Sequence, residues 1–337
     1  MLLVASDPAC AEHDTGSGHP ERVRRLQAAL EGLTAASLGD AVVPLESRAA
    51  TVEELARVHP PEYLDALQRF CAAGGGAVDP DTAVSEGSWR AATCAAGAGL
   101  AAVEALRRGD GEAAFLAVRP PGHHALASRP MGFCLLNNVA VTAAHLVAEG
   151  ERVLVLDWDA HHGNGTEAIF WEDPRILYVS AHEYGRGVYP GTGALDDIGG
   201  EAARGTTLNL PFPAMTTGDT YLRALDEVVA PTVEEFAPTW VLVSAGYDAH
   251  RADPLTNMGL SAGDFADIAR RVAAFAPQPG RLVLFLEGGY DLDALTESVG
   301  ASLAAILERP YRPEPATAGG PGGSVIDAAR RLRDELG

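Results

Sequence analysis

The chain of 337 residues contains no lysine, and all 25 of its basic residues are arginines. Its 46 acidic residues outnumber them and give a formal net charge of −21. Nucleic-acid binding depends on many Lys and Arg contacts to phosphates, so we expect no nucleic-acid partner. An acidic surface attracts cationic ligands, although the same charge also serves ordinary solubility.

Cysteine and long apolar runs are scarce as well. The four cysteines show neither the paired spacing of a structural zinc site nor the density of a disulfide scaffold. No segment has the length and apolarity of a signal peptide or a membrane-spanning helix. We therefore expect a cytoplasmic protein without a membrane partner.

Short apolar runs alternate with longer amphipathic segments along most of the chain. The alternation predicts a single α/β domain over residues 1–310, with a mostly parallel central sheet and helices on both faces. Residues 311–337 differ: a Pro- and Gly-rich segment precedes apolar residues at helical spacing from 324 to 336. We expect that helix to pack on the domain, with partner binding as the alternative. The predicted strands are 114–118, 152–156, 240–243 and 281–286, and the predicted helices are 21–33, 88–108, 138–149, 219–236 and 262–275.

Four of the apolar runs end in glycine-containing segments that carry histidine, aspartate or tyrosine. The most informative is DWDAHHGNGT, residues 157–166, which follows a short buried strand. An acid and an imidazole two residues apart at the carboxyl end of a parallel strand can converge on one cation. Residues 120–124 (PPGHH), 244–248 (SAGYD) and 287–290 (EGGY) end the other three runs, so their side chains are expected at the same edge of the sheet.

Together these segments resemble the zinc-dependent histone deacetylase family, whose relatives include acetylpolyamine amidohydrolases and bacterial histone deacetylase-like amidohydrolases. RPPGHHA, Gly132-Phe133-Cys134, DWDAHHGNGT, GYDAH and EGGY carry the resemblance, with GHPER at 18–22 and residues 58–64. It extends over residues 1–310 and implies the arginase-deacetylase fold. Trp158 and Asn164 are more similar to the class II branch than to class I.

Asp159, His161 and Asp248 form an oxygen–nitrogen–oxygen set. Three protein ligands with one open position are typical of a catalytic zinc site. The same set also accepts Fe(II), Co(II) or Mn(II). Gly163 stands where binuclear arginases carry a further aspartate, so we expect one Zn²⁺ per chain. For His162 we expect a supporting or packing role.

The resemblance implies acid–base work by the tandem histidines, with His124 as the principal base and acid and His123 as its electrostatic partner. Asp157 is the expected hydrogen-bond acceptor for His123, and Asn164 the expected one for His124. A neutral amide stabilises an imidazolium less than a carboxylate does, so we expect a low pKa for His124. Tyr290 is expected to donate a hydrogen bond to the oxyanion.

The resemblance further implies a narrow acyl-lysine channel, an exit region with Arg22, and a structural K⁺ behind the metal loop. The expected channel residues are Gly132, Phe133, Tyr189, Leu255, Gly288 and Gly289. The expected K⁺ ligands are Asp157, the carbonyls of Asp159 and His161, Ser180 and the carbonyl of Ala181.

The substrate stays open at this point. Polyamine-selective relatives carry an acid at the position of Leu255, so its neutral side chain favours acyl-lysine. Asp79, Asp81 and Glu86 can nevertheless supply negative charge near the channel mouth, and an acetylpolyamine or another small-molecule amide is the alternative. A catalytically silent binding protein and an arginase-like ureohydrolase are further alternatives, and a homo-oligomer is compatible with the sequence.

Overall fold

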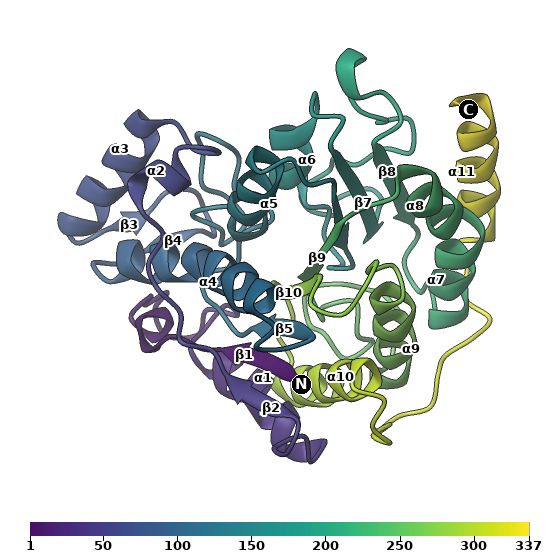
Figure 1. Ribbon diagram of the computed structural model, residues 1–337, viewed down its shortest axis with the longest axis horizontal. Coiled ribbons are helices and arrows are strands. Elements are labelled where there is room, and N and C mark those ends of the chain that lie inside the picture. The colour runs from purple at the N-terminus through teal and green to yellow at the C-terminus, as the bar shows by residue number, and fades with distance from the viewer. Residues whose placement is uncertain (337) are drawn as a thin grey trace.

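The computed structural model describes residues 1–336 and is built around a sheet of eight strands (Figure 1). The strand order is β2-β1-β5-β10-β9-β6-β7-β8, and every neighbouring pair is parallel, as predicted. A separate antiparallel pair is formed by β3 (Gly76–Ala77) and β4 (Ala83–Val84). The strands of the large sheet are β1 (Leu2–Ala5), β2 (Val42–Pro44), β5 (Ala113–Leu116), β6 (Val153–Asp157), β7 (Ile176–Glu183), β8 (Thr207–Phe212), β9 (Trp240–Ala245) and β10 (Leu282–Leu286).

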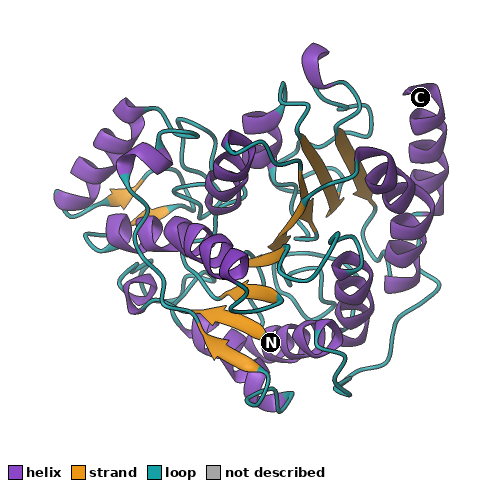
Figure 2. Ribbon diagram, in the orientation of Figure 1, coloured by secondary structure: helices purple, strands orange, loops and turns teal. Residues whose placement is uncertain are grey.

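The central strands are apolar on both faces because helices cover both sides of the sheet (Figure 2). Helices α4 and α5 pack against β5, β6, β9 and β10, and on the other side α10 packs between α1 and α9. The helices are α1 (Arg24–Ala35), α2 (Val52–Leu55), α3 (Pro61–Ala72), α4 (Ser88–Arg108), α5 (Asn138–Ala148), α6 (Asn164–Phe170), α7 (Gly218–Ala224), α8 (Ala230–Phe236), α9 (Ala262–Ala273), α10 (Leu292–Ile306) and α11 (Gly323–Leu336).

The helix predicted over 219–236 is present, because the chain is helical without a break over residues 218–236. Between α7 and α8 the chain forms a π-helical turn, Leu225–Val229. Pro231, in the first turn of α8, has no backbone N–H to donate to the preceding turn. A wider turn accommodates such a missing bond without ending the helix, which explains why the middle of this helix is π-helical.

The C-terminal helix α11 lies along the edge of the molecule beside β8, α7 and the π-helical turn (Figure 1). An extended segment leads to it from α10. Ile326 and Ala329 are buried against the body of the protein, and Arg333 donates a hydrogen bond to the carbonyl of Gly205 (2.6 Å). Among the described residues, no helix combines the length and apolarity needed to cross a lipid bilayer.

Candidate metal centre and active site

The four predicted polar segments follow β5, β10, β9 and β6, which are neighbours in the sheet. Parallel strands place their carboxyl ends at the same edge, so these loops meet above the middle of the sheet. The pairing of Asp157 with Ser180 on one side and Ser244 on the other fixes the register there.

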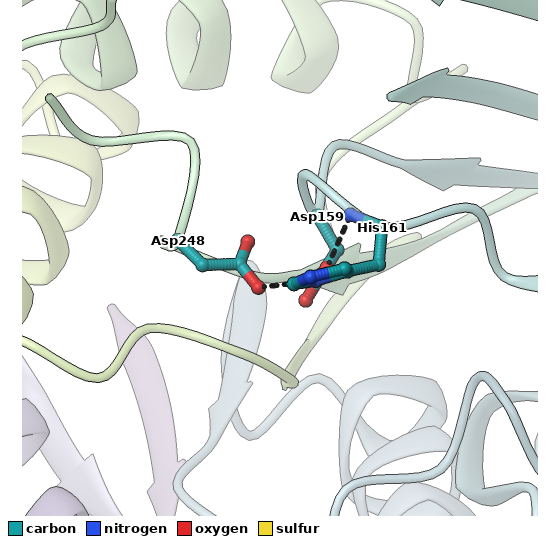
Figure 3. A group of neighbouring side chains, drawn as sticks. All are labelled: Asp159, His161 and Asp248. Atoms are coloured by element: carbon teal, nitrogen blue, oxygen red, sulfur yellow. Dashed lines mark hydrogen bonds and ion pairs between the residues drawn. The ribbon is translucent and has the colours of Figure 1, made fainter. Parts of the chain in front are cut away.

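Asp159, His161 and Asp248 converge on one point (Figure 3). One ligand atom of each lies within 4.8 Å of the others. His161 Nδ1 is 3.2 Å from Asp159 Oδ1 and 2.9 Å from Asp248 Oδ2. Burial alone would lower the pKa of His161, but the charges of Asp248 and Asp159 raise it well above its usual value. Two buried carboxylates and an imidazole turned toward one point form a donor set that fits a divalent transition metal.

Backbone amides hold the two carboxylates in this position. Asp159 accepts bonds from the N–H groups of His161 and Gly288 (both 2.8 Å), and Asp248 accepts one from Ala160 (2.8 Å). Gly288 lies so close that a Cβ there would stand 2.6 Å from Asp159 Oδ2 and would also collide with Asp248. The glycine at this position therefore makes room for the metal ligands.

His123 is buried and paired with Asp157 (Nδ1 to Oδ2, 2.9 Å). Tyr178 donates to the same Asp157 oxygen (3.3 Å) and to the carbonyl of Gly163 (3.1 Å). Burial disfavours the charged imidazole, but Asp157 and Asp159 outweigh it and raise the pKa of His123 to about 10. A Cβ at Gly163 would lie 2.6 Å from the Tyr178 hydroxyl and would overlap Asp157, so this pair also requires glycine at 163.

His124 has the opposite electrostatic environment. Burial and the neighbouring His123 and His161 lower its pKa well below the usual value. Its Nδ1 lies 2.8 Å from Asn164 Oδ1, the expected partner. The His123 and His124 rings lie 4.0 Å apart between centroids with their planes tilted by 44°, so the structure brings together one histidine that favours the charged form and one that favours the neutral form.

Tyr290 is buried beside this cluster, and burial raises the pKa of its phenol well above the usual value, so the hydroxyl keeps its proton. Asp253 accepts a bond from the Tyr290 backbone N–H (2.7 Å). Burial and the nearby charge of Asp248 raise the pKa of Asp253 to about 7.

The internal position expected for Arg22 belongs instead to Arg25. Arg22 is exposed in the turn before α1, whereas Arg25 faces inward from the first turn of that helix and is fully buried. The Arg25 guanidinium lies 4.9 Å from the centroid of the Tyr290 ring and donates to the carbonyls of Gly289 (2.6 Å) and Glu287. The arginine expected in the internal exit region is therefore Arg25, three residues after the predicted Arg22.

Phe133 and Tyr189 lie on two sides of the site. The Phe133 ring stands edge-on to Tyr290 at 5.8 Å, and Tyr189 stands edge-on to His124 at 5.1 Å. Gly132 packs on His124, because a Cβ there would be 2.5 Å from the imidazole. Leu255 is 42% exposed and donates its N–H to Asp253, which places it next to the Tyr290 loop.

The residues expected to hold K⁺ lie on the β6–β7 side of the site. Asp157 and Ser180 are register partners, and the chain continues from them into the Asp159–His161 loop and to Ala181. Ser180 Oγ lies 2.9 Å from His182 Nδ1, and the carbonyl of Ala181 accepts a bond from Tyr221 (3.2 Å).

Several supporting residues have roles that no spacing in the sequence indicates. Glu287 is fully buried and accepts bonds from the N–H groups of Gly122 (2.7 Å) and His123 (3.2 Å), so it joins the histidine loop to β10. Burial raises its pKa to about 7. Asp253 and Arg25 act in a similar way on the tyrosine loop. Most of their bonds are to backbone groups, although Arg25 also donates to Glu21 (3.2 Å) and Glu287 accepts from Ser244 (3.4 Å).

The chain belongs to the histone deacetylase family. The family model described as "Histone deacetylase domain" matches residues 19–306. A "Probable deacetylase" of Archaeoglobus fulgidus is 38% identical over 318 residues, covering 90% of this chain and 88% of that protein. A "Histone deacetylase-like amidohydrolase" of Pseudomonas aeruginosa is 39% identical over 289 residues, covering 84% of this chain and 74% of that protein.

A solved structure agrees with these sequence relatives. The crystal structure of the HDA15 HD domain superposes with a TM-score of 0.90 at 33% identity, covering 99% of this chain and 94% of that one. The protein is thus a deacetylase, a hydrolase that acts on acetylated amines. The predicted family, fold and enzyme class are confirmed.

Proposed function

We propose that the protein is a zinc-dependent deacylase of acyl-lysine side chains. The convergence of Asp159, His161 and Asp248 beside a histidine pair and a buried tyrosine carries the proposal. A bound Zn²⁺, one per chain, would polarise the amide carbonyl and lower the pKa of water. A structural K⁺ behind the metal loop is part of the same proposal.

The protein's own side chains then divide the remaining work. His124, held at Nδ1 by Asn164, has its Nε2 available to take a proton from water and to return it to the leaving amine. His123, paired with Asp157, supplies fixed positive charge beside it. The Tyr290 hydroxyl donates to the developing oxyanion, a bond worth roughly a hundred- to a thousandfold in rate. Arg25 and Asp253 hold the tyrosine loop in place from behind.

The channel residues support a linear acylated side chain as the substrate. Phe133 and Tyr189 flank the approach to the histidines, as aromatic walls along a methylene chain would. Leu255 presents an exposed apolar side chain beside the Tyr290 loop, where it offers no charge to a polyamine.

A second candidate substrate is an acetylpolyamine, and one observation favours it. Asp79 and Asp81 lie near enough to Tyr189 to contribute to the rise in its pKa, after the larger effect of burial. Two acids beside a channel wall attract a free ammonium group, and the net charge of −21 acts in the same direction.

Turnover on two matched panels distinguishes the candidates. We expect acetyl-lysine peptides to have a higher kcat/KM than N-acetylputrescine and N-acetylspermidine, with a wild-type preference that changes little in an Asp79→Asn, Asp81→Asn variant. A preference for the acetylpolyamines that disappears in that variant would establish the second candidate. Asp110→Asn combined with Glu234→Gln, at exposed positions in the turn after α4 and on α8, removes the same number of charges and is the charge-matched control.

A further inference from the structure

The residue before Gly132 belongs to a tight hairpin that packs on the catalytic histidine. Met131 and Cys134 exchange both backbone hydrogen bonds (3.1 and 2.9 Å), and the two residues between them have positive φ values of 55° and 68°. That pattern is a type I′ turn, and for Phe133 the left-handed backbone is uncommon. Thr82 accepts a bond from the Phe133 N–H (3.1 Å). The two bonds to Cys134 therefore fix the backbone of Met131, and the bond to Thr82 fixes the turn that follows it.

The side chain of Met131 reaches the amide that orients His124. Its thioether sulfur lies 3.4 Å from Asn164 Nδ2, while Asn164 Oδ1 lies 2.8 Å from His124 Nδ1. Arg129 Nη2 approaches the same sulfur at 3.1 Å. The amide of Asn164 is thus placed between an imidazole nitrogen and a sulfur atom, with one end toward each.

The two ends of an amide are chemically different, so its orientation determines the tautomer of the histidine. An amide oxygen can only accept a hydrogen bond. When it faces Nδ1 of a neutral imidazole, Nδ1 must therefore carry the hydrogen, and Nε2 keeps its lone pair. With the amide reversed, the NH₂ group would donate to Nδ1, and the hydrogen would move to Nε2. A base that acts through Nε2 is then in the wrong tautomer.

The sulfur distinguishes the two orientations. A thioether is a weak acceptor and never a donor, so it can receive the N–H of the amide but gains nothing from the amide oxygen. We infer that Met131 is a positioning residue for catalysis, whose sulfur fixes the amide of Asn164 and thereby keeps His124 as the Nδ1–H tautomer. The inference rests on the proposed function, in which His124 Nε2 is the base. An aspartate at 164 has two equivalent oxygens, so this need for sulfur applies only to asparagine.

A double-mutant cycle tests the inference in the zinc-loaded enzyme. Met131→Leu preserves size and removes the acceptor, and we expect kcat to fall by about two- to tenfold, the range for one modest hydrogen bond, with KM unchanged. In an Asn164→Asp background the same Met131→Leu change should have no effect on kcat. Met215→Leu, at a methionine that is 63% exposed, is the control and should match the wild type.

NMR spectra of isotopically labelled histidine provide a readout that does not depend on turnover. The ring nitrogens of His124 should report the Nδ1–H tautomer in the wild type and a mixture of tautomers in Met131→Leu. An equal loss of kcat in the wild-type and Asn164→Asp backgrounds would show that Met131 acts only by packing in the channel. An unchanged tautomer in Met131→Leu would overturn the inference. If the wild type hydrolyses no acylated amine, the proposed function fails, while the tautomer measurement still decides the role of Met131.

Discussion

At the scale of single residues, the acid–base chemistry of the site depends on the different surroundings of two similar side chains, the neighbouring histidines. His123 and His124 are adjacent and both buried, yet a carboxylate faces one and an amide faces the other. The DWDAHHGNGT, PPGHH and GYD segments indicate these residues because metal ligands and acid–base groups recur at fixed spacing. The supporting roles of Arg25, Asp253 and Glu287 could not be predicted in this way, since each binds backbone groups of a distant loop.

The pairing of His124 with an amide leads to a prediction about pH. A base must be neutral, so activity is lost as the pH falls through its pKa; the low pKa of His124 keeps the enzyme active into mildly acidic solution. In Asn164→Asp the added carboxylate favours the imidazolium, so the acidic limb of kcat/KM should move upward by about one pH unit or more. Gln68→Glu, an exposed change of equal charge on α3, should leave the profile unchanged. An unshifted limb in Asn164→Asp would count against His124 as the base.

At the scale of elements, the central strands were predictable and some of the rest was not. β5, β6, β9 and β10 stand out because uninterrupted apolar runs end in polar, glycine-containing loops. Helix α10 escaped prediction because small residues pack it between α1 and α9, which weakens its apolar periodicity. The π-helical turn depends on the single missing N–H of Pro231, a local effect that periodicity does not resolve.

The packing of α11 leads to a prediction about the stability of the protein. Ile326 is fully buried where α11 meets the body of the protein, so Ile326→Ala should lower the free energy of unfolding by about 2–5 kcal/mol. The kcat/KM of the folded enzyme should not change, because α11 lies beside β8 and not at the catalytic loops. Denaturant titration measures the first quantity, with exposed Arg331→Ala as the control. A loss of activity without a loss of stability would assign α11 a role in the site.

At the scale of the whole molecule, one parallel sheet brings four loops that are far apart in the sequence to a common edge. The order β5-β10-β9-β6 places the histidine, tyrosine and metal loops next to one another, although residues 117–281 lie between the neighbouring strands β5 and β10 in the chain. The absence of lysine has a practical consequence here. Acetate released in an assay cannot come from acetylated lysines of the enzyme itself.

The most direct test of the account is the release of acetate from an acetyl-lysine peptide as a function of bound metal. Chelation should abolish turnover, and about one equivalent of Zn²⁺ per chain should restore it. Asp248→Asn should fail to regain activity at that stoichiometry, whereas Tyr290→Phe should bind the metal but remain roughly a hundred- to a thousandfold slower. Full turnover by the metal-free protein, or restoration that requires two metal ions per chain, would contradict the account.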